Sequence, residues 1–135
     1  MQNPEFINIE LAVAIHEDLI DTFGGSQGIR DKGLLESALA QPQASFFGNL
    51  LHSTIEEQAA AYLYHIGKNH PFVDGNKRTA LGVMEAFLGM NGYKLNISNS
   101  DLENLVLDVA NDKINKSTLA EMIKKYLVKI QNKNS

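Results

Sequence analysis

The sequence predicts a compact all-α domain of about six helices that spans residues 1–135. Apolar residues recur at helical spacing through most of the chain, and capping residues and glycines divide this pattern into segments of helix length. Only residues 93–97, YKLNI, are typical of an extended segment. A chain of 135 residues is long enough to bury a core of its own as a single domain.

The first three helices are predicted from their apolar spacing and their boundaries. Asp31 can cap a short second helix that ends before Pro42. Ser53 is followed three residues later by Glu56, which is the pattern of a capping box at the start of an Ala-rich third helix. The first helix covers residues 8–23, ends at a pair of glycines and carries an i, i+4 apolar row: Leu11, Ile15, Leu19 and Phe23.

The last three helices follow the same logic. Residues 76–90 form a helical pattern that ends at an Asn-Gly pair, which supplies a left-handed stop. Ser100 and Glu103 repeat the capping-box spacing at the start of the fifth helix. The sixth helix is expected over residues 117–130, with three side chains facing inward: Leu119, Ile123 and Leu127.

Composition excludes several classes of protein. The formal net charge of −4 argues against a nucleic-acid binder, which is normally basic. No run of about 18 apolar residues is present to span a membrane, and the N-terminus lacks the pattern of a signal peptide. The absence of cysteine excludes disulfides and thiolate metal sites, and it fits a cytoplasmic location.

Residues 41–53, QPQASFFGNLLHS, do not fit a helical bundle. A connection of this length is uncommon in a small domain and is often functional. It carries two adjacent phenylalanines, Phe46 and Phe47. Two interpretations stay open: these rings cap the core, or the segment is a flap that holds a partner segment over a site.

The stretch HPFVDGNKR, residues 70–78, poses an electrostatic problem. Lys77 and Arg78 fall in the first turn of a helix, where a cation is unfavourable by about 0.3–1 kcal/mol. Residues 74–76 are of types that tolerate positive φ and can turn successive N–H groups toward one concavity. Such a nest at a helix N-terminus binds phosphates, so the two cations are well placed only if a polyphosphate neutralises them.

The same stretch holds the other parts that group transfer from a nucleotide needs. Asp74 is its only carboxylate and is the candidate ligand for the Mg²⁺ that accompanies a polyphosphate. His70 carries an imidazole, the side chain most often used as a general base, and could take this role toward an incoming hydroxyl. Pro71 should end the preceding helix before His70, and Phe72 is expected to enter the core and fix the path of the loop.

HPFVDGNKR resembles the signature H-x-F-x-[D/E]-G-N-[G/K]-R of the Fic/Doc (Fido) superfamily. The segments IHEDLIDTFGG, GIRDKGLLESAL and NKRTALGVMEAFLGMNGY extend the resemblance to the Doc branch, the death-on-curing toxins, over almost the whole chain. The resemblance implies a Fido helical bundle with a short extended flap. It also implies an enzyme that uses Mg²⁺ and ATP to modify a hydroxyl group of a target protein.

The resemblance also implies a role for each matched position. His70 would take the proton from a Ser, Thr or Tyr hydroxyl, Phe72 would be the buried anchor, Asp74 the Mg²⁺ ligand, Gly75 and Asn76 the anion-binding nest, and Arg78 the phosphate clamp.

Two positions bear on the reaction. Lys77 occupies a position that is Gly in AMP-transferring relatives, and Leu81 replaces a further arginine. Both changes are features of Doc toxins, in which ATP binds reversed and its γ-phosphoryl group is transferred to elongation factor Tu. Gly75 and Pro71 instead match the AMP-transferring pattern, so AMP transfer from ATP is the alternative. A non-catalytic module that binds a nucleotide or a partner is the third hypothesis.

The sequence also addresses inhibition. Many Fic proteins block their own site with a helix that bears [S/T]-x-x-x-E-[G/N]. Ser53 with Glu57, and Ser117 with Glu121, have the first part of this spacing but lack the final residue. The Doc resemblance therefore implies a small Phd-like antitoxin that inhibits in trans and a protein substrate such as a translation factor. The acidic composition and the lack of a long apolar run argue that neither nucleic acid nor a membrane is a partner.

Overall fold

The computed structural model describes residues 3–131 and has the predicted all-α class. Within these residues the six helices are α1 (Ile9–Phe23), α2 (Lys32–Ala40), α3 (Ile55–Asn69), α4 (Asn76–Met90), α5 (Asn99–Ala110) and α6 (Lys116–Tyr126). A 3₁₀ turn (Gln41–Gln43) precedes a small antiparallel hairpin of β1 (Ser45–Phe46) and β2 (Asn49–Leu50), and β3 (Tyr93–Leu95) pairs antiparallel with β4 (Leu127–Lys129).

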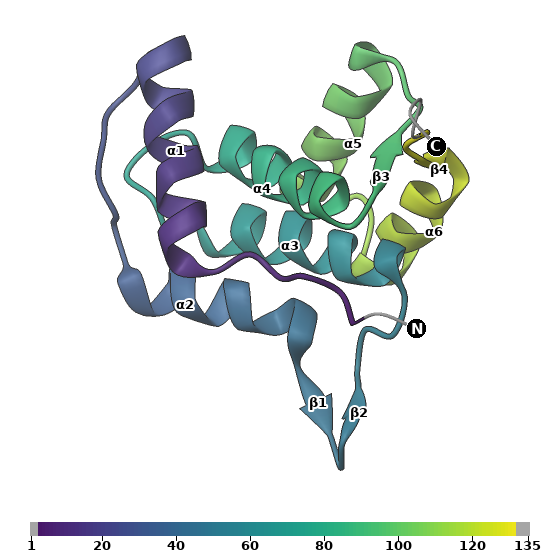
Figure 1. Cartoon of the computed structure of the whole chain (residues 1–135). Helices are drawn as coiled ribbons and strands as arrows, with labels where there is room; N and C mark the ends of the chain where they lie inside the picture. The colour runs from purple at the N-terminus through teal and green to yellow at the C-terminus, as the bar shows by residue number, and fades with distance from the viewer. Residues whose placement is uncertain (1–2, 132–135) are drawn as a thin grey trace.

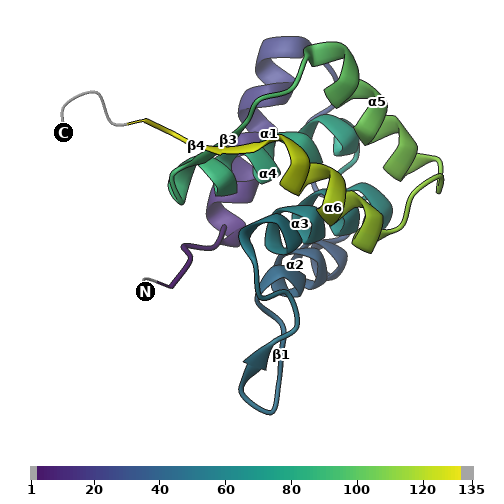
Figure 2. The same ribbon diagram turned by 90° about the vertical axis from the view of Figure 1, so that its right-hand side faces the viewer.

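Helix α3 lies at the centre of the molecule (Figure 1). It packs against α2, α4 and α6, and α1 packs against α4. Figure 2 shows the β1–β2 hairpin extending away from the helices. Within residues 3–131, none of the helices combines the length and the hydropathy that a bilayer-spanning segment requires.

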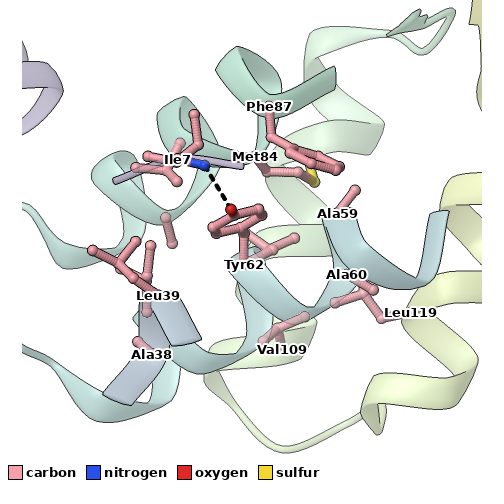
Figure 3. Packing of buried hydrophobic residues seen from close by; sticks show 14 of the residues in the cluster. Ile7, Ala38, Leu39, Ala59, Ala60, Tyr62, Met84, Phe87, Val109 and Leu119 are labelled. Carbon is pink, nitrogen blue, oxygen red and sulfur yellow. Dashed lines mark hydrogen bonds between the residues drawn. The ribbon is translucent and has the colours of Figure 1, made fainter. Parts of the chain in front are cut away.

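The centre of the core is set by small side chains on α3. Ala59, Ala60 and Ala61 are all 0% exposed, so neighbouring helices can approach α3 closely. Tyr62 follows them, and its ring centroid lies 5.0 Å from that of Phe87 on α4 (Figure 3). Alanines and one large ring therefore bring α3 and α4 together, which fixes the two helix ends that flank residues 70–75.

The Tyr62 hydroxyl ties the N-terminal segment to this core. It accepts a hydrogen bond of 2.8 Å from the main-chain N–H of Ile7, and both residues are buried (Figure 3). Burial raises the pKa of Tyr62 to about 12, so the hydroxyl stays protonated. Helix α1 begins two residues after Ile7, so this bond helps to set where α1 lies.

Tyr62→Phe is expected to lower the free energy of unfolding by about 1–3 kcal/mol, because it leaves the buried Ile7 N–H without a partner. Urea unfolding followed by circular dichroism measures the loss. Tyr64→Phe is the matched control, since Tyr64 is half-buried and its hydroxyl has no hydrogen bond among the described residues. Equal losses in the two variants would contradict the role of the Ile7 bond.

Two predicted helix starts are wrong by one or two residues. Thr54, not Ser53, caps α3: its side chain accepts from Glu57 N, and its hydroxyl donates to Glu57 Oε1 at 2.8 Å. Ser98, not Ser100, caps α5. A cap residue must be extended while the next residue is already helical, and the sequence offers more than one polar residue of suitable type at each start.

The C-terminal prediction is partly wrong. Leu119 and Ile123 are fully buried as expected, but α6 ends at Tyr126 and Leu127 opens strand β4. Residues 127–129 pair with β3, where Leu127 faces Leu95. The chain leaves the helix because β3 offers it unpaired main-chain groups, a contact between segments far apart in sequence.

Helix α1 buries a different row from its apolar one. The buried side chains are Ala12, His16 and Ile20, whereas Leu11 is 36% and Phe23 62% exposed. The buried row is displaced by one residue because His16 makes two contacts inside the molecule, which are described below.

Within the segment 41–53, residues 45–50 form a protruding hairpin. Phe46 and Phe47 are 64% and 88% exposed, and their rings contact each other edge to face. The interpretation that they cap the core is therefore wrong. Phe47 and Gly48 both have positive φ, 50° and 79°, which is the two-residue turn that suits a hairpin.

Candidate active site

The loop between α3 and α4 takes its shape from two left-handed residues. Helix α3 ends at Asn69, as Pro71 predicts, and His70 then adopts φ 47° and ψ 55°. Gly75 adopts φ 73° and ψ 23° directly before α4. Positive φ was expected at residues 74–76, but of these only Gly75 has it, and the second left-handed residue is His70.

The loop runs antiparallel to residues 28–31, which precede α2. Val73 N donates to Gly28 O at 3.0 Å, and the N–H groups of Arg30 and Asp31 both donate to Pro71 O, at 2.7 and 3.0 Å. These bonds pair main-chain groups of the loop, Pro71 O and Val73 N, that lie beyond the end of α3. The loop is therefore held by a segment about forty positions earlier in the chain.

Arg30 is a residue that the sequence interpretation left without a role. Its Nε donates to His70 O at 2.7 Å, and its Nη2 donates to Asn69 O at 2.8 Å. The chain contains only two arginines, Arg30 and Arg78. That scarcity was the one available signal, since no local spacing connects residue 30 to residue 70.

Helix α1 contacts the loop between α3 and α4 through His16. Phe72 is 1% exposed and stacks on His16, with ring centroids 3.9 Å apart and an interplanar angle of 6°. The Nε2 atom of His16 also hydrogen-bonds Asp74 O at 2.8 Å. His16 is thus a contact between α1 and the loop.

The side chain of Asn76 holds the loop by two hydrogen bonds to the main chain of Phe72. Its Oδ1 accepts from Phe72 N at 2.8 Å, and its Nδ2 donates to Phe72 O at 3.0 Å. The amide thereby closes a ring with the main chain of Phe72. What Asn76 can offer an anion is its main-chain N–H, because the first helical bond of α4 is donated by Thr79.

The Asp74 carboxylate is exposed and can still accept further ligands. Its Oδ1 accepts from Gly75 N at 2.9 Å, and its Oδ2 accepts from Ser26 N at 3.1 Å. Each oxygen of an ionised carboxylate has capacity for another partner. A Mg²⁺ ion bound with a polyphosphate needs only one or two carboxylates, so the donor set around Asp74 fits this ion.

The N-terminus of α4 differs from the other helix starts. The other five described helices have a side-chain cap, whereas Gly75 provides none and the first turn holds no acidic residue. Lys77 and Arg78 are exposed, and within residues 3–131 neither forms an ion pair. The Arg78 guanidinium carbon lies 4.4 Å from the centroid of the Phe23 ring. Positive charge therefore accumulates at this helix end without a carboxylate partner.

A cavity of about 410 Å³ is lined by His70 and residues 73–78. It brings the imidazole, the Asp74 carboxylate and the two cations together. Phe46 and Phe47 do not join them. The hairpin is attached near the start of α3 and His70 follows its end, and 15 helical residues rise about 22 Å.

His70 is the one exposed histidine of the four in the chain. His16 and His52 are buried, and burial together with Lys116 lowers the pKa of His65 to about 4. Neutral His65 already accepts a hydrogen bond from Lys116 Nζ at 3.1 Å. Among these residues, His70 is therefore the imidazole that an incoming substrate can reach.

Gly75→Ala is expected to destabilise the protein through two effects. A Cβ there would lie 2.9 Å from Ile20 Cδ1 on α1, and φ is positive. Gly92→Ala is the matched control, because Gly92 also has positive φ, 84°, but its Cβ would meet nothing within 4 Å. We expect the free energy of unfolding, measured in urea, to fall by about 1–3 kcal/mol more in Gly75→Ala than in Gly92→Ala. Equal losses would show that the Ile20 side chain moves aside without an energetic penalty.

Comparisons of the sequence with known proteins gave a family match and two relatives. A sequence model described as Fic/DOC family matches residues 6–88. A protein named Toxin Doc from Mycolicibacterium smegmatis is 45% identical over 73 residues, which are 54% of this chain and 56% of that protein. A protein named Protein kinase doc from Escherichia phage P1 is 30% identical over 119 residues, 88% of this chain and 93% of the phage protein.

Proposed function

The chain belongs to the Fic/DOC family, and on that premise we propose that it is a Doc-type toxin that phosphorylates a hydroxyl side chain of a target protein. ATP is the proposed phosphoryl donor and Mg²⁺ the proposed metal. A translation factor is the proposed target, with elongation factor Tu as the first candidate because the Doc resemblance implies it. The names of the two relatives, a toxin and a protein kinase, support this choice.

One observation carries the proposal: two cations, with no ion-pair partner among residues 3–131, stand at the N-terminus of α4, which has no side-chain cap, in one cavity with an exposed imidazole and a carboxylate. An empty helix start of this kind repels its own side chains. A triphosphate would neutralise the cations and accept hydrogen bonds from the free N–H groups of the first turn.

His70 is assigned as the general base. Its imidazole accepts the proton of the target hydroxyl while the hydroxyl oxygen bonds to the γ-phosphorus. The bond from that phosphorus to the β,γ-bridging oxygen breaks, and ADP leaves with its electron pair. Arg78 is assigned to grip phosphate oxygens, and Lys77 supplies a second positive charge. Positioning and charge stabilisation provide most of such catalysis.

Asp74 is assigned as the metal ligand. Mg²⁺ bound there with the nucleotide would neutralise part of the phosphate charge. The two hydrogen bonds that Asp74 accepts, from Gly75 N and Ser26 N, hold its carboxylate at the edge of the cavity. This assignment implies that chelation by EDTA removes transfer activity and that added Mg²⁺ restores it.

Transfer from labelled ATP tests the proposal. The purified protein is incubated with Mg²⁺, elongation factor Tu or cell extract, and ATP labelled at the α or the γ phosphorus. Protein labelled only from the γ position is the expected result. Label only from the α position would replace phosphorylation by AMP transfer, and label from neither would favour a module that binds without catalysis.

Lys77→Gly is expected to shift the product toward AMP transfer, because it opens space beside the first turn of α4 and removes one of the two charges that orient the triphosphate. The same two labels measure the ratio of products. Lys94→Gln is the control, because Lys94 is an exposed cation that does not line the cavity. An unchanged ratio in Lys77→Gly would show that Lys77 does not select the orientation.

An antitoxin acting in trans is part of the proposal. Glu57, one of the two acids with the spacing of an internal inhibitory helix, is held in the cap of α3 by the Thr54 hydroxyl. A short open reading frame beside the gene is the first candidate for a Phd-like antitoxin. Its co-expression should relieve growth arrest.

A further inference from the structure

Three consecutive main-chain carbonyls at the end of α3 are bound by one residue. The guanidinium of Arg30 donates to Asn69 O and His70 O, and its N–H donates to Pro71 O. The middle carbonyl belongs to His70, the proposed base. Arg30 itself lines neither the cavity nor the first turn of α4.

His70 adopts a backbone conformation that is unfavourable for it in isolation. Its φ of 47° and ψ of 55° are left-handed, which is rare for a residue with a side chain. It also precedes Pro71, and residues before proline prefer extended dihedrals. The surrounding structure must therefore hold His70 in place.

The two bonds of the guanidinium span the torsions that decide this conformation. Asn69 O lies before the φ and ψ angles of His70, and His70 O lies after them. A turn of His70 to extended dihedrals would redirect its carbonyl, so the rigid fork of Arg30 could no longer reach both oxygens. The guanidinium charge also suits the negative end of α3.

We propose that Arg30 is a positioning residue that holds His70 in its left-handed conformation and so aims the imidazole at the acceptor hydroxyl. The inference rests on the proposed function of His70. It does not make Arg30 part of the nucleotide site, because its described contacts are with main-chain oxygens. Loss of Arg30 should therefore lower kcat and leave the affinity for Mg·ATP nearly unchanged.

The test compares Arg30→Met and Arg30→Lys with wild type in two independent measurements. The first is kcat for label transfer, with the dissociation constant of Mg·ATP from calorimetry. The second is the ¹³C chemical shifts of His70 Cα and Cβ, which report its φ and ψ without any reaction. We expect kcat to fall about 10–100-fold in Arg30→Met, as a small misplacement of a reacting group does, with His70 shifts moving toward extended values.

Arg30→Lys keeps the charge but has one donor group instead of a planar fork, so an intermediate loss is expected. If Arg30→Met does not fold, the same two measurements on Arg30→Lys still test the proposal. Lys32→Gln is the control, because Lys32 is an exposed cation two residues away with no hydrogen bond from its side chain among the described residues. It should match wild type.

The outcomes separate the two proposals. If the wild-type protein transfers neither label, the proposed function fails, and the His70 shifts alone still decide whether Arg30 holds His70. If transfer occurs and both Arg30 variants keep wild-type kcat, or lose kcat without a change in the His70 shifts, the positioning role is overturned. Full activity and unchanged shifts in Arg30→Lys would overturn the need for two bonds.

Discussion

His70→Ala is expected to lower label transfer by about 10²–10⁴-fold, which is the usual contribution of a general base. Binding of Mg·ATP should persist, because the first turn of α4 and the side chains of Lys77 and Arg78 are unchanged. Label incorporation measures the loss, and calorimetry measures the binding. A protein that binds Mg·ATP but no longer transfers label would distinguish the enzyme from a non-catalytic module.

A second substitution separates the imidazole from the backbone. His70→Asn also removes the base, but asparagine tolerates the left-handed region better than alanine does. Both variants should lose transfer to the same extent, whereas Asn should preserve thermal stability at least as well as Ala. Transfer that survives in either variant would show that another group accepts the proton.

Phe72→Ala is expected to lower the free energy of unfolding by about 3–5 kcal/mol, the cost of removing a buried phenylalanine. That is a large part of the 5–15 kcal/mol typical of a whole domain. The ring is 1% exposed and stacks on His16, so its loss also frees the histidine that hydrogen-bonds Asp74 O. Affinity for Mg·ATP should fall together with stability.

Val73→Ala is the matched control for Phe72→Ala. Val73 is the next residue of the same loop, but it is 55% exposed, and its main-chain bond to Gly28 does not depend on the side chain. Its stability should stay within about 0.5 kcal/mol of wild type. Urea unfolding compares the two variants, and a Phe72→Ala loss as small as that of Val73→Ala would show that the ring does not anchor the loop.

The helices illustrate what local patterns can predict. Each predicted helix exists, because apolar spacing and caps act over three or four residues. The starts of α3 and α5 were misplaced by one or two residues because several Ser and Thr side chains compete for the cap. The spacing of Leu127 predicts a continuation of α6, but pairing with β3 prevails at that point.

In the candidate site, too, the features that depend on neighbouring residues were predictable and those that depend on distant contacts were not. Residues 70–78 were identified as one unit because the histidine, the carboxylate and the cations are contiguous, and the structure gathers them around one cavity. Arg30 and the stacking of His16 on Phe72 were missed. These contacts join residues that lie far apart in the chain, and nothing in their local surroundings indicates a partner.

The helical class and the charge imbalance at the start of α4 can be read from the residues alone, since both depend on neighbours within one turn of helix. Contacts between distant segments set which face α1 buries, the strand at residues 127–129 and the left-handed conformation of His70. The buried face of α1 and the conformation of His70 depend on contacts across 58 positions, from His16 to Asp74, and 40 positions, from Arg30 to His70. The strand at residues 127–129 depends on its pairing with β3. Such contacts are set by how the helices pack together, and residue spacing along the chain does not encode them.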